Sequence, residues 1–328
     1  MIGIFKQKAP GNVALLLIVG LLLKLPLFLY PKVMPAIGAE GKLYLAIAGW
    51  IAGSGVPALS GILSFLLLYV QALIITGILN EYRMTTRQTF LPGLSYMLIT
   101  SLLPEWSFFS APLVATTLIL WAFAKLFHLY NNEFANGRIY NIGLLLGLAS
   151  FIYFPSFLFG VCIIIGLLIL RPFRLNELFL IVLGSTTPFY FYAAYLLLWD
   201  NFTVAQLFLA LSIHLPGVQN SLWIVGSILF LILPFLTGAY YIQINLRKML
   251  IQARKNWSII LFYLLSGLLI GFINGSGVFS NWIIVVAPFA AFHACAYFYP
   301  PRQWLSSFLF FTMLAFIIIQ QYGTTVWQ

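Results

Sequence analysis

Long apolar stretches alternate with short polar segments along the whole chain. A helix needs about 20 mainly apolar residues to cross a bilayer, and somewhat fewer when it packs inside a bundle. The sequence predicts eleven such spans, at residues 12–30, 57–79, 89–103, 109–129, 138–154, 156–170, 177–199, 221–245, 257–273, 280–298 and 303–320. The count falls to ten if one of the short segments only dips into the membrane. We therefore predict an all-α fold, a polytopic transmembrane helix bundle of about eleven spans that forms a single integral membrane domain over residues 1–328.

The basic residues test this map independently, because cytoplasmic loops are enriched in Lys and Arg. If the N-terminus is cytoplasmic, thirteen of the 16 basic residues fall on the inner side: Lys6, Lys8, Arg83, Arg87, Lys125, Arg138, Arg171, Arg174, Arg247, Lys248, Arg254, Lys255 and Arg302. The outer loops hold only Lys32 and Lys42, and Lys24 lies within the first span. A misplaced span would scramble this division, so the N-terminus is predicted to be cytoplasmic.

Composition argues against a soluble protein. Of the 328 residues, 62% are hydrophobic and 7% are charged, whereas a soluble domain needs about 25% charged residues to cover its surface. The formal charge of +10 follows from the inner loops, and we expect no nucleic-acid partner, because no basic helix or aromatic-basic platform occurs. Cys162 and Cys295 fall inside apolar spans and are predicted to be packing residues.

Two outer loops are long enough to contain helices that lie in the membrane interface. In the first outer loop, residues 31–56, apolar side chains recur at helical spacing before Gly53-Ser54-Gly55 breaks the pattern; they are Leu43, Ile47, Trp50 and Ile51. In the fourth, residues 200–220, Thr203 and Gln206 have the spacing of a capping box. Interfacial helices are therefore predicted in both loops.

Three of the six acidic residues, Glu40, Glu105 and Asp200, fall in different outer loops. If they converge in one outward cavity, a carboxylate there could act as a general base or hold a divalent metal ion. Lys42 could then bind a substrate phosphate, and His214 could join the site. The alternative is that these residues are solvated loop charges.

The other acidic residues lie on the inner side and are predicted to form local ion pairs: Glu81 with Arg83, Glu133 with Arg138, and Glu177 with Arg174. Within the spans, Lys24 and His293 are ionisable, and such residues are functional candidates by default. Gly143 and Gly147 have the spacing that allows close packing of helices.

The chain resembles, from end to end, a family of uncharacterised polytopic inner-membrane proteins of Bacteroidetes-type bacteria. The resembling stretches are Ile4-Phe5-Lys6, Asn80 to Met84, Leu91-Pro92-Gly93-Leu94, Phe151 to Pro155 and Leu170-Arg171-Pro172-Phe173. It implies a multi-pass protein of the bacterial inner (cytoplasmic) membrane. It implies no activity, because that family carries no established one.

The topology also resembles that of GT-C glycosyltransferases, which take sugars from polyprenyl phosphates. Those enzymes begin in the cytoplasm and carry a catalytic carboxylate in a long first outer loop with interfacial helices. Glu40 is the only acidic residue in the corresponding loop here. The chain departs from the family pattern because it lacks the Asp-Glu or Asp-Asp pair and a soluble outer domain.

Three functions remain open. The first is a GT-C-like enzyme acting on a polyprenyl-phosphate-linked substrate at the outer face, with Glu40 as base or metal ligand, Glu105 and Asp200 assisting, and Lys42 holding a phosphate. The second is a non-catalytic membrane subunit of an envelope assembly or secretion complex, since no catalytic motif is recognisable. The third is a transporter of lipid-linked substrates, although no inverted repeat is detectable.

Overall fold

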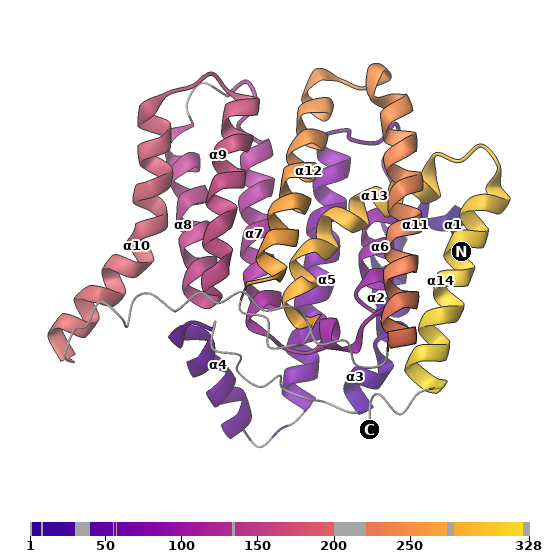
Figure 1. The fold of residues 1–328 in the computed structure, drawn as a ribbon, viewed down its shortest axis with the longest axis horizontal. Coiled ribbons are helices and arrows are strands. Elements are labelled where there is room, and N and C mark those ends of the chain that lie inside the picture. Colours follow the sequence, from indigo (N-terminus) through magenta and orange to yellow (C-terminus); the bar gives the residue numbers. More distant parts are fainter. Residues whose placement is uncertain are drawn as a thin grey trace.

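The computed structural model of the chain describes residues 2–7, 9–29, 40–54, 56, 58–132, 135–199, 221–273 and 279–323. Within these ranges its regular secondary structure is helical and contains no β-strand (Figure 1). The α-helices are α1 Ile2–Phe5, α2 Gly11–Leu23, α3 Leu25–Leu29, α4 Lys42–Gly53, α5 Ala58–Glu81, α6 Leu91–Ile99, α7 Ala111–Phe127, α8 Asn136–Ile152, α9 Phe159–Leu170, α10 Leu175–Trp199, α11 Ser221–Asn245, α12 Ile251–Gly271, α13 Val286–Phe298 and α14 Gln303–Gly323. The 3-10 helices are η1 Pro104–Ser107, η2 Phe154–Leu158, η4 Leu246–Lys248 and η5 Phe279–Val285.

Among the residues that the structure describes, five helical segments are long and apolar enough to cross a membrane: Ala58–Glu81, Leu175–Trp199, Trp223–Lys248, Phe279–Phe298 and Gln303–Gln321. The prediction of a helical membrane protein is confirmed at this level. Each of the other predicted spans also coincides with a helix, but with a shorter or less apolar one. In Figure 1 the helices stand side by side, with α10 at one edge and α14 at the other.

The loops predicted to be cytoplasmic meet at one end of the bundle, which we call the inner end. The backbone N–H of Phe90 donates to the carbonyl oxygen of Phe5 at 2.9 Å. The indole N–H of Trp257 donates to the carbonyl oxygen of Met84 at 3.0 Å. These contacts join segments that the charge pattern places on the same side of the membrane.

The loops predicted to be outside meet at the opposite end, the outer end. The hydroxyl of Tyr44 donates to the carbonyl oxygen of Phe109 at 3.3 Å. The indole N–H of Trp106 donates to the carbonyl oxygen of Phe279 at 2.9 Å. These contacts join segments that the charge pattern places together on the other side of the membrane.

Close packing of α8 against α10 depends on glycine. A Cβ atom built on Gly143 would lie 2.3 Å from the carbonyl oxygen of Ile181, and one on Gly147 would lie 2.3 Å from that of Ser185. From the other side, a Cβ on Gly184 would lie 2.4 Å from the carbonyl oxygen of Tyr140. The predicted role of Gly143 and Gly147 in helix packing is confirmed, and the partner helix is α10.

The third predicted span, residues 89–103, forms a shorter helix than expected. α6 ends at Ile99, and the hydroxyls of Thr100 and Ser101 both donate to the carbonyl oxygen of Met97, at 3.1 and 2.8 Å. Hydroxyls that bond to nearby carbonyls compete with continuation of a helix. All nine residues of α6 are buried, so this half-length helix lies inside the bundle.

The first outer loop contains the helix that its periodicity predicts, α4, but the buried face differs. The side chains turned toward the protein are Tyr44 and Ile51, whereas Leu43 and Trp50 are exposed, Trp50 by 67%. The apolar repeat therefore predicted the helix correctly, but it predicted only part of the face that packs against the protein. The helix predicted in residues 200–220 lies outside the described residues.

Candidate functional site

An apolar cavity of about 630 Å³ lies between α11, α12, η5 and α13, and the η1 turn also contributes to its wall. Its wall consists of Leu103, Trp106, Ile224, Val225, Ser227, Ile228, Leu231, Ile232, Leu268, Phe272, Phe279, Trp282, Val285 and Phe289. The wall from Ile224 to Ile232 extends roughly 12 Å along α11. Ligand sites have this volume and this mainly apolar lining, so the cavity suits a hydrocarbon chain.

A carboxylate, that of Glu105, lies next to the outer end of this cavity. Glu105 lies in η1 between the wall residues Leu103 and Trp106, and its Oε2 accepts the backbone N–H of Phe279 at 2.5 Å. Burial raises the pKa of Glu105, and the hydrogen bond from Phe279 offsets part of that rise. A partly buried carboxyl with a raised pKa holds its proton more tightly than a solvated glutamate does, and such a group is a candidate general acid or base.

Two polar side chains at the cavity bond to the backbone. Ser227 donates to the carbonyl oxygen of Leu102 at 3.2 Å. His293 is fully buried on α13, and its Nε2 lies 2.8 Å from the carbonyl oxygen of Leu231. A carbonyl can only accept, so Nε2 carries the proton, and Nδ1 has no hydrogen-bond partner among the described residues. His293 therefore braces a wall helix.

Glu40 is buried at a different part of the outer end. It forms an isolated antiparallel bridge with Tyr153, and the N–H of Gly41 donates to the carbonyl oxygen of Ile152 at 2.8 Å. Only glycine fits at position 41, because a Cβ there would lie 1.7 Å from the carbonyl oxygen of Phe151. The backbone of the first outer loop is thus fastened to the end of α8, with the Glu40 side chain 7% exposed.

The other predicted site residues are less informative. Lys42 is exposed at the first residue of α4, and its ammonium lies 5.8 Å from the ring centre of Tyr192 on α10. Asp200 and His214 lie outside the described residues. Glu40 and Glu105 are held by different elements, α8 and η5, and neither belongs to the wall of the apolar cavity. Convergence of the three carboxylates stays a prediction.

The described ranges contain no group of three or more His, Cys, Asp or Glu side chains that could hold a metal ion. Carboxylate or imidazole clusters are what divalent ions need in proteins. The divalent metal ion suggested for the outer carboxylates therefore has no support from the described side chains.

The inner acidic residues pair differently from the prediction. Glu177 binds Arg171, not Arg174, with 2.9 Å between Oε1 and Nη2, and both side chains are buried. Glu81 lies 3.5 Å from Nδ1 of His128 rather than pairing with Arg83. The prediction from sequence proximity was wrong for Glu177, because the turn between α9 and α10 directs the Arg171 side chain into the protein. Glu133 lies outside the described residues.

A polar cleft of about 520 Å³ at the inner end was not expected from the sequence. Its lining is Glu81, Tyr82, His128, Tyr130, Asn131, Asn132, Arg138 and Gln252. The Tyr82 hydroxyl lies 3.1 Å from Nδ1 of His128 and 3.1 Å from the carbonyl oxygen of Ala124. The cleft is open, and Glu81 and His128 are more than half exposed, so it has the character of a solvated surface.

No protein-family model, no curated protein and no solved structure matches this chain. The two resemblances noted for the sequence therefore remain expectations.

Proposed function

We propose that the chain is an eleven-span protein of the bacterial inner membrane that acts at the outer face on a lipid-linked substrate, as a GT-C-like glycosyltransferase or related enzyme. The observation that supports this most is the apolar cavity between α11, α12 and η5, which has a titratable carboxyl, Glu105, at its outer end. A polyprenyl or similar chain would enter the cavity, and its phosphate would lie near the outer surface.

In this proposal Glu105 is the leading general base, ahead of Glu40. Its carboxylate would take the proton of an acceptor hydroxyl while the oxygen attacks the sugar carbon and the lipid phosphate leaves with the bonding electrons. Glu40, Asp200, Lys42 and His214 would contribute by position or by charge. Glu40 is second because its backbone pairs with Tyr153 at the end of α8, whereas Glu105 lies in the chain between the wall residues Leu103 and Trp106.

The experiment separates binding from chemistry. Protein in proteoliposomes is exposed to a photoreactive polyprenyl phosphate, and the labelled fraction is measured by mass spectrometry. Ile228→Trp fills the cavity, and Leu229→Trp is the matched control, because it lies next on α11, is similarly exposed and is not in the wall. We expect labelling of the wild type and the control and its loss in Ile228→Trp; equal labelling of all three would contradict the proposal.

Turnover is then measured with a polyprenyl-phosphate sugar. Removal of a general base lowers the rate about 10²–10⁴-fold, so Glu105→Gln should bind the lipid but release little sugar. If Glu105→Gln and Glu40→Gln both retain full turnover, the assigned chemistry is wrong even where the lipid binds.

A non-catalytic membrane subunit is the second candidate, and α10 favours it. In Figure 1 the outer part of α10 bends away from the other helices. Its side chains there are strongly exposed, including Leu198 and Trp199 at 73% each. A photocrosslinking residue at Leu198, with one at Leu265 on α12 as control, tests this, since a partner subunit would be captured in stoichiometric amount from Leu198 alone.

A further inference from the structure

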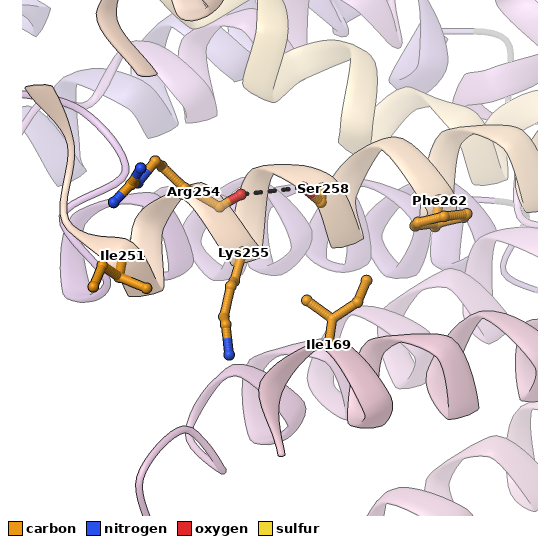
Figure 2. A pocket seen from close by; sticks show the side chains of 6 residues that line it. All are labelled: Ile169, Ile251, Arg254, Lys255, Ser258 and Phe262. Atoms are coloured by element: carbon orange, nitrogen blue, oxygen red, sulfur yellow. Dashed lines mark hydrogen bonds between the residues drawn. The ribbon is translucent and has the colours of Figure 1, made fainter. Parts of the chain in front are cut away.

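A groove separates the inner ends of α9 and α12 (Figure 2). It has a volume of about 520 Å³ and is open to the surroundings of the protein. Its lining consists of Ile169 from α9 together with Ile251, Arg254, Lys255, Ser258 and Phe262 from α12. No carboxylate belongs to this lining.

The groove is cationic at one end and apolar along the rest. In Figure 2 the side chain of Lys255 extends from α12 toward α9, and Ile169 faces the gap from α9. The guanidinium of Arg254 lies toward the start of α12, and Phe262 lies two turns further on. Phe262 is seven positions after Lys255, which corresponds to roughly 10 Å along the helix axis. This is the polarity pattern of an amphiphile with an anionic head.

Electrostatics at the start of α12 also call for an anion. Arg254 and Lys255 lie within the first five residues of the helix, and its first turn contains no acidic residue. Cations at a helix N-terminus oppose the helix dipole, whereas an anion there is stabilised. Within the described ranges the contact of Lys255 is with the ring of Tyr130, at 5.3 Å, and no ion pair joins Arg254 or Lys255 to a carboxylate.

We propose that this groove binds an anionic phospholipid of the inner leaflet. Its phosphodiester would lie between Arg254 and Lys255, and the first part of one acyl chain would lie between Ile169 and Phe262. A free phosphate would satisfy the cations but would leave the apolar walls uncovered, which favours a lipid. This site is independent of the function proposed for the outer end.

The test is lipid retention in native mass spectrometry. The wild type is released from nanodiscs that contain phosphatidylglycerol and phosphatidylcholine in equal amounts, and we expect one retained phosphatidylglycerol. Each basic residue near a membrane surface strengthens anionic lipid binding about fivefold, so Arg254→Gln with Lys255→Gln should lower retention roughly thirtyfold. Arg247→Gln with Arg302→Gln removes the same charge from the inner end outside the groove and should retain the lipid.

The apolar half of the groove is tested separately. Ile169→Trp fills the space between the helices, and Leu168→Trp, on the exposed neighbouring position, is its control. We expect lipid loss only in Ile169→Trp. Equal loss in the two double charge variants would reduce the effect to general surface charge, and full retention in Ile169→Trp or displacement by excess inorganic phosphate would overturn the lipid site.

Discussion

The ammonium of Lys24 donates a hydrogen bond to the carbonyl oxygen of Thr100 at 2.7 Å, in the interior of the protein. It also donates to the hydroxyl of Ser107 at 2.6 Å, and the Lys24 side chain is only 1% exposed. Thr100 is the residue that follows α6, so the cation lies at the negative end of a helix dipole. Lys24 itself stands where α2 ends and α3 begins. Lys24 therefore has a structural role: it connects the break between α2 and α3 to the end of α6. A transport role would require an acidic partner, and its partners here are a carbonyl and a hydroxyl.

Replacement of Lys24 by methionine should destabilise the protein. The change removes the ammonium donor from the Thr100 carbonyl, which keeps only the Ser107 hydroxyl at 3.3 Å, and from Ser107 itself. A lost charged hydrogen bond of this kind is worth about 1.5–3 kcal/mol. We expect the free energy of unfolding in an SDS titration to fall by about that amount. Lys42→Met, at an exposed position, should be neutral. Normal stability of Lys24→Met with complete loss of cellular function would instead indicate a transport role.

The buried pair of Arg171 and Glu177 should be the most sensitive charged site at the inner end. The two side chains are 7% and 3% exposed, and Arg171 also donates to the carbonyl oxygen of Leu129. Loss of one partner leaves an uncompensated buried charge, which costs about 3–5 kcal/mol. Arg171→Leu should therefore destabilise strongly, and Arg174→Leu, the exposed neighbour, should not. Recovery of stability in Arg171→Leu with Glu177→Leu would identify the unpaired charge as the cause.

Glu105 should make the free energy of unfolding decrease as the pH of the solution rises. Burial raises the pKa of Glu105 in the folded protein, so the folded state binds the proton more tightly than the unfolded state. The free energy of unfolding then decreases from the ordinary glutamate range up through the folded pKa and is lower above it. Melting temperatures of the wild type and Glu105→Gln, measured from acid to neutral pH, should differ in slope across this window. Identical slopes would mean that Glu105 keeps its ordinary pKa.

The sequence predicted elements well and partners poorly. The helices follow from runs of apolar residues, a local property, and even the short α4 was found from its repeat. The partner of Glu177 was missed because sequence distance favoured Arg174, whereas the backbone turn decides which arginine faces inward. The carbonyl that binds Lys24 is 76 positions away, and no local pattern reports such a contact.

The same limit applies to the candidate site. Glu105 was recognised because acidic residues are rare, but its donor, the N–H of Phe279, comes from a segment 174 positions further along. The cavity beside it has walls from five separate elements, so its existence depends on how the helices pack. Alternating charge predicts a topology from the sequence alone, because it records a property of every loop at once.

Contact between α8 and α10 offers a prediction with an internal control. A Cβ on Gly147 would lie 2.3 Å from the carbonyl oxygen of Ser185, which is backbone and cannot rotate away, whereas a Cβ on Gly137, near the start of the same helix, meets nothing within 4 Å. Gly147→Ala must therefore push the helices apart and should lower the free energy of unfolding by about 1–3 kcal/mol. Gly137→Ala should be neutral or stabilising by up to about 1 kcal/mol, because alanine favours helix.

SDS titrations of both variants measure this difference. The backbone of Glu40 pairs with Tyr153 at the end of α8, so only Gly147→Ala should also increase protease cleavage in the first outer loop. Equal stability of the two variants would mean that α8 and α10 do not pack through these glycines.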